Sequence, residues 1–240
     1  MEILSAKDLT IKLFADGADL DSILKLNELP HVKGFTTNPT LMRKAEIINY
    51  ENFARAVLEQ ITDKPVSFEV FSDEFEDMHR QAMKIASWGA NVYVKIPITN
   101  TRAESSVPLI KRLLGEGVPL NVTAIMSKPQ LDELATVYQK DSKVFISVFA
   151  GRIADAGRDP VPYIKHACAQ AKPYSDVEVL WASCREVFNI VQAQESGCHI
   201  ITVTNSLLEK INVFGKDLSD YSLDTVKMFY RDAQLSGFVL

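Results

Sequence analysis

Short apolar segments alternate with longer segments of helical periodicity along nearly the whole of this 240-residue chain. Many of the short segments are apolar on both faces, which is typical of parallel strands that are covered by helices. The predicted strands are Ile11–Asp16, Gly34–Asn38, Val66–Phe71, Asn91–Ile98, Leu120–Ile125, Val144–Ala150, Glu178–Ser183 and Cys198–Thr204. The predicted helices between them are Leu41–Gln60, Glu74–Trp88, Arg102–Leu114, Pro129–Gln139, Pro162–Lys172 and Glu186–Glu195.

Eight strands with helical crossovers fit a closed (β/α)8 barrel, the TIM-barrel architecture, within the α/β class. A chain of this length suits one large domain, so residues 1–240 are expected to form a single catalytic barrel. A final helix is predicted from about Ser222 to Gln234. An open, doubly wound sheet is the alternative, but no glycine-rich phosphate loop follows the first strand.

Three segments carry signals for the start of a helix. Asn38 stands directly before Pro39, which places a capping side chain ahead of proline at the first helical position. The segments Ser127–Gln130 and Ser183–Glu186 both match the capping box, in which two side chains satisfy backbone amides reciprocally. These signals support the helices predicted after the second, fifth and seventh strands.

The composition argues against several kinds of partner. A net charge of −5, with no block of basic residues, gives no electrostatic footprint for nucleic acid or for an anionic membrane. No apolar stretch approaches the length of a membrane span, and the first residues lack the pattern of a signal peptide. Cys168, Cys184 and Cys198 fit no metal-ligand spacing, so we expect free thiols, a cytoplasmic location and no metal site.

Lys95 lies near the end of a predicted strand that is otherwise mostly apolar. Burial disfavours the charged form of a lysine, and a neutral amine can attack a carbonyl to form a Schiff base. Two structural alternatives compete with this interpretation, because a long lysine can extend to solvent or pair with a carboxylate. The role of Lys95 therefore depends on the residues around it.

The carboxyl ends of other predicted strands also carry polar residues, and in a barrel these ends surround the active site. The residues are Asp16, Asn38, Glu69, Asn121, Thr123, Ser147 and Ser183. Their recurrence at equivalent places predicts one site, in which Asp16 and Glu69 supply acid–base groups beside Lys95. Structural alternatives remain, since Asn38 and Ser183 can act only as helix caps, and Glu69 can form a buried ion pair with Lys95.

Arg152 and Arg185 lie just past the ends of the sixth and seventh predicted strands, so both are expected at the same mouth of the barrel. A guanidinium group suits a phosphate because its donors form a planar fork. Ser183 and the backbone amides at the start of the following helix are expected to complete an anion site. The alternative is two solvated surface arginines.

These motifs resemble those of the transaldolase family over nearly the whole chain. Gly34–Leu41 resembles the family signature at the second strand, and Val94–Pro97 resembles the Schiff-base segment of the short subfamily that includes fructose-6-phosphate aldolase. Further matches follow in the family's order, at Phe14–Asp16, Leu120–Thr123, Ile146–Arg152 and Ala182–Arg185. The resemblance implies a (β/α)8 barrel, sugar phosphate substrates, no metal or organic cofactor, and a homo-oligomer such as a pentamer or decamer.

The resemblance also implies roles for individual residues. Lys95 would form the imine with the ketose, Asp16 would take the proton of the substrate hydroxyl, and Glu69 would shuttle protons through a water held by Thr123. The residues implied to bind the dihydroxyacetone unit or line its pocket are Asn38, Asn121, Ser147 and Phe149. The residues implied to bind the phosphate are Arg152, Ser183 and Arg185.

The resemblance favours a transferase over a lyase. Glu69 and Phe149 resemble the transaldolase residues, where the aldolase subfamily carries glutamine and tyrosine. The aldolase reaction, which releases free dihydroxyacetone, is the second hypothesis. A barrel that binds a sugar phosphate without turning it over is a third, although such a protein has no need of a buried amine. An aldolase of the deoxyribose-phosphate type is a fourth, and the Thr36–Pro39 segment counts against it.

Overall fold

A computed structural model describes residues 8–239 of the chain. The chain forms two compact units, of which the larger comprises Thr10–Leu208 and the smaller includes the segment from Glu209 onward. The larger unit contains every predicted strand and every predicted site residue.

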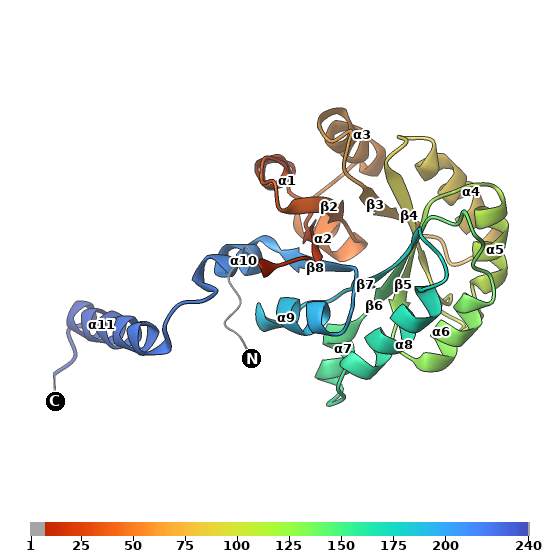
Figure 1. Ribbon diagram of the computed structural model, residues 1–240. Helices are drawn as coiled ribbons and strands as arrows, with labels where there is room; N and C mark the ends of the chain where they lie inside the picture. The colour runs from red at the N-terminus through yellow and green to blue at the C-terminus, as the bar shows by residue number, and fades with distance from the viewer. Residues whose placement is uncertain (1–7, 240) are drawn as a thin grey trace. The chain divides into compact units, whose positions relative to one another are not determined.

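The larger unit is a closed barrel of eight parallel strands in sequential order, so the predicted fold class is confirmed. Figure 1 shows the helices outside the ring of strands. Each strand lies within about two residues of its prediction. The strands are β1 (Lys12–Asp16), β2 (Val32–Thr36), β3 (Val66–Glu69), β4 (Val92–Pro97), β5 (Leu120–Ile125), β6 (Val144–Val148), β7 (Val177–Trp181) and β8 (Ile200–Thr204).

The helices of the barrel unit alternate with its strands. Three short helices, α1, α7 and α10, were not predicted. The helices are α1 (Leu20–Asn27), α2 (Pro39–Lys44), α3 (Tyr50–Gln60), α4 (Phe75–Ala86), α5 (Val107–Gly115), α6 (Lys128–Ala135), α7 (Ala150–Asp155), α8 (Val161–Ala171), α9 (Phe188–Glu195) and α10 (Asn205–Leu208).

The predicted helix Leu41–Gln60 is wrong as a single element, because the chain breaks between α2 and α3. Glu46 adopts a left-handed backbone with φ of 54°, which a continuous helix does not allow. Asn49 then caps α3 by accepting a hydrogen bond from the backbone amide of Asn52 at 2.9 Å. The two helices therefore have separate starts, and the second start places Tyr50 at the first position of α3.

The two predicted capping boxes differ in outcome. Ser127 forms the box with Gln130 at the start of α6, as predicted. The box at Ser183–Glu186 is wrong, because α9 begins only at Phe188. Ser183 instead has a left-handed backbone with φ of 65°, which bends the chain sharply after β7.

The core of the barrel is an aromatic layer beneath the polar strand ends. Phe14, Phe145 and Tyr93 pack together, with the Tyr93 and Phe145 rings stacked at 3.9 Å and 6°. Residues two apart in a strand share a face, so these rings lie one layer below Asp16, Ser147 and Lys95. Gly34 leaves room for the Phe14 ring, since an added Cβ would lie 2.5 Å from a ring carbon. The aromatic layer thus forms the floor of the polar layer above it.

The smaller unit contains a 3₁₀ helix (Glu209–Val213) and the long helix α11 (Leu218–Ser236). The predicted final helix is confirmed, and it extends beyond its predicted bounds at both ends. Asp217 caps the start by accepting from the amides of Ser219 and Asp220, and Gly237 ends the helix in a left-handed conformation. No residue of α11 is buried. Within residues 8–239, neither α11 nor any other helix is long and apolar enough to cross a membrane.

Candidate active site

A cavity of about 590 Å³ lies at the carboxyl ends of the barrel strands. It brings together ten of the eleven residues that the sequence predicted for the site. These ten are Asp16, Asn38, Glu69, Lys95, Thr123, Ser147, Phe149, Arg152, Ser183 and Arg185. The eleventh, Asn121, is fully buried and contacts the cavity wall from behind.

Lys95 projects into this cavity from β4 and is only 6% exposed. Its Nζ atom donates a hydrogen bond to the backbone oxygen of Thr37 at 2.9 Å and lies 3.5 Å from Oε2 of Glu69. Glu69 and Lys95 are partners in the register of β3 and β4, so their side chains leave the sheet side by side. The amine thus has a carboxylate beside it, which both the acid–base hypothesis and the alternative of a buried ion pair require.

Asp16 ends β1 and lies beside a pair of bonded threonine hydroxyls. Thr36 donates to Oδ1 of Asp16 at 2.8 Å, and the hydroxyl oxygens of Thr36 and Thr202 lie 2.5 Å apart. Because Thr36 gives its one proton to Asp16, Thr202 is the donor in the second bond. Burial raises the pKa of Asp16, while the charge of Lys95 and the bond from Thr36 act in the opposite direction. A raised pKa suits a carboxyl that accepts and returns a proton.

Thr123 presents a buried hydroxyl that has no hydrogen-bond partner among the described residues. The next residue, Ala124, has φ of 63°, and the β5–β6 register shifts between Val122 and Ile125. An unpaired buried hydroxyl is costly, so a strained segment that holds one at a cavity wall points to a use there. Water or a substrate hydroxyl would satisfy this group.

Ser147, Asn121 and Ser67 form a chain of side chains behind the cavity. Ser147 donates to Oδ1 of Asn121 at 2.6 Å, and Nδ2 of Asn121 donates to the hydroxyl of Ser67 at 3.0 Å. This chain fixes the orientation of the Ser147 hydroxyl, which lines the cavity. Asn121 therefore acts on the cavity through Ser147.

Asn38 combines a structural contact with a place in the cavity. Its Oδ1 accepts from the backbone amide of Leu41 at 2.9 Å and so caps α2, as predicted. The cap uses only the oxygen of the side-chain amide, so the two Nδ2 donors stay outside the cap. Capping is thus compatible with a second role toward a substrate hydroxyl.

The two predicted arginines both line the cavity, but their surroundings differ. Arg152 lies 5.8 Å from the centre of the Phe149 ring. Arg185 is bound by Asp155, which accepts from Nε at 3.0 and 3.1 Å and also from Nη2. The bond to Asp155 raises the pKa of Arg185. Asp155 follows Arg152 by one turn of α7, so this short helix supplies one arginine and the partner of the other.

The backbone around Ser183 leaves no space for a side chain at Gly151. A Cβ atom added at Gly151 would lie 1.6 Å from the backbone oxygen of Ser183. The amides of Arg185 and Glu186 both bond Oδ1 of Asn189, at 2.9 and 3.2 Å. Contrary to expectation, these amides are occupied by a side chain of α9 and do not form an open helix start.

Sequence reasoning missed Thr36, Thr202, Thr204 and Lys44, which also line the cavity. Threonine is common in any strand, so Thr36 and Thr202 carry no signal of their own. Thr36 lies opposite Asp16 in the β1–β2 pairing, and Thr202 lies opposite Phe14 in the β1–β8 pairing and contacts Thr36. Closure of the barrel brings β8 beside β1, but the sequence does not specify the register that places Thr202 next to Thr36.

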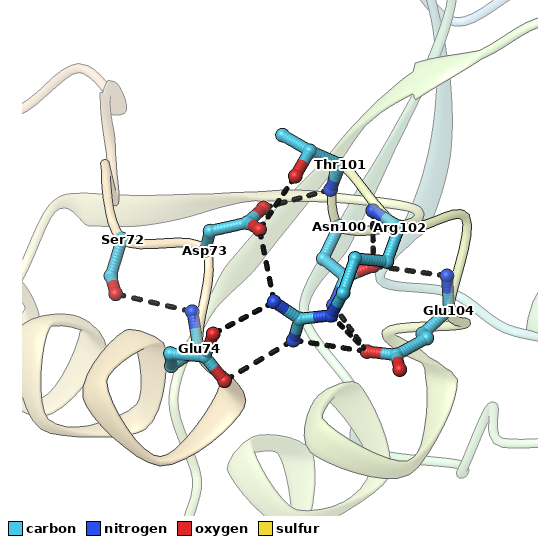
Figure 2. A network of polar contacts seen from close by, with 7 residues as sticks. All are labelled: Ser72, Asp73, Glu74, Asn100, Thr101, Arg102 and Glu104. Carbon is cyan, nitrogen blue, oxygen red and sulfur yellow. Dashed lines mark hydrogen bonds and ion pairs between the residues drawn. The ribbon is translucent and has the colours of Figure 1, made fainter.

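A network of ion pairs joins the two loops that follow β3 and β4 (Figure 2). Arg102 reaches across to Glu74, with Nη1–Oε1 and Nη2–Oε2 distances of 2.8 and 3.1 Å. Asp73 accepts from the amide of Thr101 at 2.7 Å, and Glu104 accepts from Arg102 Nε at 3.2 Å. Since β3 and β4 carry Glu69 and Lys95, this network links the loops directly beyond the two residues. No group of three or more residues suited to hold a metal ion occurs in residues 8–239.

Comparisons with known proteins identify the family of the chain. The sequence profile described as Transaldolase/Fructose-6-phosphate aldolase matches residues 13–237. A probable transaldolase 2 of Listeria monocytogenes is 35% identical over 84% of this chain and 88% of its own length. Probable transaldolases of Nitrosopumilus maritimus and Thermoanaerobacter sp. are each 32% identical, over 84% and 94% of this chain and 87% and 99% of their own lengths.

A solved structure of dihydrodipicolinate synthase from Rhodopseudomonas palustris matches 97% of this chain and 82% of its own, with a TM-score of 0.55 and 16% identity. At that identity the likeness concerns the fold alone. The fold and the cavity define a (β/α)8 barrel with a buried amine among acid–base groups. The chain belongs to the transaldolase/fructose-6-phosphate aldolase family.

Proposed function

We propose that the protein is a transaldolase that works through a Schiff base on Lys95. It would transfer a dihydroxyacetone unit from a ketose phosphate, such as sedoheptulose 7-phosphate or fructose 6-phosphate, to an aldose phosphate. The observation that carries this proposal is the buried Lys95 amine, 3.5 Å from Glu69 in a cavity that also contains Asp16 and two arginines. A barrel that only binds a sugar phosphate would not need a buried amine, because burying one is costly.

In the first half of the reaction, Lys95 Nζ attacks the ketose carbonyl and water leaves, which yields the imine. Glu69 supplies and removes protons in this step, together with a water that the unpaired Thr123 hydroxyl would hold. Asp16 then takes the proton of the hydroxyl on carbon 4 while the bond between carbons 3 and 4 breaks. The electron pair of that bond moves into the protonated imine, and the shortened aldose phosphate leaves.

In the second half, the resulting enamine attacks the carbonyl of the acceptor aldose phosphate. Asp16 returns its proton to the new hydroxyl, and the same water and Glu69 hydrolyse the imine to free Lys95. Thr36 would keep the Asp16 carboxylate oriented through both transfers by its hydrogen bond to Oδ1, and Thr202 would hold the Thr36 hydroxyl in turn. The proton balance closes over one cycle without another reactant.

The remaining cavity residues would bind the substrate. Asn38 and Ser147 are placed to hold hydroxyls of the dihydroxyacetone unit, and Asn121 orients Ser147 from behind. Arg152 and Arg185 would bind the phosphate with help from Ser183. Phe149 also lines the cavity and would contact the sugar between its dihydroxyacetone unit and its phosphate. Asp155 already takes one edge of the Arg185 guanidinium, so the phosphate would use the donors that remain.

The transaldolase and aldolase reactions share the enamine intermediate. In the first the enamine attacks an acceptor aldehyde, and in the second it takes a proton. Glu69 and Phe149 resemble the transaldolase residues, which supports transfer to an acceptor. The aldolase reaction is the second candidate, and the two are separated by assaying free dihydroxyacetone with and without erythrose 4-phosphate. Rapid release in the absence of an acceptor would contradict the preference for transfer.

We also propose that the chain assembles as a homo-oligomer, a pentamer or a decamer. Helix α11 supports this, since Leu223, Val226, Phe229 and Tyr230 fall on one face and are all exposed. An apolar face of this kind is typical of a helix that packs against another surface. Sedimentation of wild type and Phe229→Glu checks the proposal, with dissociation expected for the variant. A wild-type monomer would contradict it.

The free thiols Cys168, Cys184 and Cys198 support a cytoplasmic location, and the substrates support a place in the pentose phosphate pathway. The profile match over residues 13–237 includes parts of both compact units, which supports one catalytic domain over residues 1–240.

Intact-mass spectrometry after borohydride treatment with fructose 6-phosphate tests the central proposal. Wild type is expected to gain the mass of one reduced dihydroxyacetone adduct, and Lys95→Met is expected to gain none and to lose turnover. The matched control is Lys111→Met, on α5, which is exposed and outside the cavity. An adduct of equal size on Lys95→Met, or no adduct on wild type with any ketose phosphate of six to seven carbons, would contradict the Schiff base.

A further inference from the structure

We infer that Tyr50 is a positioning residue for the acid–base group Glu69 and, through the same hydrogen bonds, for Lys95. This inference rests on the proposed function. Tyr50 begins α3 and does not line the active-site cavity. Its hydroxyl donates to the backbone oxygen of Glu69 at 2.8 Å and accepts from the backbone amide of Glu69 at 2.7 Å. One phenol thus binds both backbone polar groups of one residue.

The Tyr50 hydroxyl occupies the place beside the end of β3 that β2 would fill if it continued. The β2–β3 pairing ends with a bond from the amide of Thr37 to the oxygen of Ser67 at 3.2 Å. In a parallel ladder the next bond would join the amide of Glu69 to the oxygen of Thr37. That amide is bound by Tyr50 instead, and the Thr37 oxygen accepts from Lys95 Nζ at 2.9 Å. The phenol therefore leaves a backbone acceptor for the reactive amine.

The other edge of β3 is held by β4. The amide of Val70 bonds the oxygen of Lys95 at 3.1 Å, and Glu69 lies opposite Lys95 in the register. Glu69 is the last residue of β3 and is thus held by the phenol on one side and the lysine strand on the other. Its carboxylate position near Lys95 depends on both contacts, because the loop beyond it is exposed at Phe71.

An aromatic cluster keeps the phenol in place. The Tyr50 ring packs edge-on against Phe68 and Phe71, at 6.3 and 5.7 Å, and lies 5.6 Å from the Trp88 ring. Burial raises the pKa of Tyr50, and the charge of Glu69 raises it as well, so the hydroxyl keeps the proton it donates. A fixed ring with a protonated hydroxyl gives Glu69 a constant partner over the working pH range.

Tyr50→Phe tests this inference because it removes the hydroxyl and keeps the ring. We expect kcat, and the rate of borohydride-trapped imine formation, to fall about ten- to a hundredfold, which is less than the full contribution of positioned proton transfer because Glu69 itself stays in place. KM is expected to change less than about twofold, since Tyr50 does not line the cavity and such transfer acts on the chemical step. The matched control is Tyr138→Phe, whose hydroxyl is also buried but has no partner among the described residues, and whose ring packs edge-on against Tyr174.

A double-mutant cycle with Glu69→Gln decides whether Tyr50 acts through Glu69. If it does, Tyr50→Phe lowers kcat by no more than about twofold in the Glu69→Gln background, because residues of one functional unit are non-additive. An equal loss in both backgrounds, or equal effects of Tyr50→Phe and Tyr138→Phe, would overturn the inference.

Amide hydrogen exchange separates failure of this inference from failure of the proposed function. The Glu69 amide is expected to exchange faster in Tyr50→Phe than in wild type and Tyr138→Phe. If wild type forms no Schiff base, the proposed function fails, and the exchange of Glu69 still tests the contact. Unchanged protection of that amide in Tyr50→Phe would overturn the positioning role in either case.

Discussion

The two sides of the cavity position their charged groups by different means. On the side of β1, β3 and β4, Asp16, Glu69 and Lys95 are largely buried, and hydroxyl or backbone groups fix them. On the side of β6 and β7, Arg152 and Arg185 sit on loops and a short helix, and Arg185 is half-exposed beside Asp155. Proton transfer needs exact placement, whereas capture of a phosphate needs charge that solvent can reach. The side of β1, β3 and β4 would therefore govern kcat, and the side of β6 and β7 would govern KM.

Asp16→Asn gives the sharpest test of the buried side. An amide cannot take the proton of the substrate hydroxyl, so kcat is expected to fall about 10²–10⁴-fold with little change in KM. The Schiff base should still form, because Lys95 and Glu69 are intact. Steady-state kinetics and borohydride trapping measure the two effects. A variant that cleaves the sugar at the wild-type rate would remove Asp16 from the mechanism.

Gly151→Ala tests the exposed side through its backbone. The added methyl group would lie 1.6 Å from the Ser183 oxygen, so the turn that carries Ser183 and Arg185 has to move. We expect a KM increase of about tenfold and a loss of about 1–3 kcal/mol in the free energy of unfolding, as for overpacked sites. Gly157→Ala is the control for the substitution, since no atom lies within 4 Å of its added Cβ and only its φ of 72° opposes the change. An unchanged KM in Gly151→Ala would separate this turn from substrate binding.

Asp155→Asn should show a smaller effect on the same side. Asp155 would compete with the phosphate that Arg185 is proposed to bind, so removing its charge is expected to lower KM about two- to fivefold while kcat stays constant, a change typical of exposed ion pairs. Inhibition by inorganic phosphate should tighten by a similar factor. A higher KM would mean that Asp155 serves mainly to orient the guanidinium.

The pH dependence of unfolding should distinguish Asp16 from ordinary surface carboxylates. Because burial raises its pKa in the folded state, the folded protein binds the proton more tightly than the unfolded chain. Ionisation of Asp16 therefore lowers the free energy of unfolding as the pH rises above about 4, which is the pKa of an aspartate in the unfolded chain. Asp16→Asn is expected to unfold at higher denaturant concentration than wild type at pH 7, and this difference should shrink as the pH falls toward 4. A constant difference would contradict the raised pKa.

Local patterns predicted most of the fold because each strand and most helices carry their own signal. Mostly apolar runs such as Val144–Val148 mark buried parallel strands, and the Ser127–Gln130 box marks the start of α6. The failures occurred where backbone conformation overrides side-chain pattern. Glu46 and Ser183 both adopt left-handed φ values, which ended one predicted helix and delayed the start of another.

The candidate site was predictable to the extent that its members end strands. Asp16, Glu69 and Lys95 stand near the carboxyl ends of β1, β3 and β4, so the sequence alone determined that a closed barrel would gather them. Only the tertiary structure decided their partners. Closure of β8 on β1 brings Thr202 to Thr36, the partner of Asp16; Asp155 reaches Arg185 across 30 residues; and Tyr50 takes the place of a strand beside Glu69. Hydrogen bonds between distant segments depend on side-chain direction and strand register, which the linear order of residues does not specify.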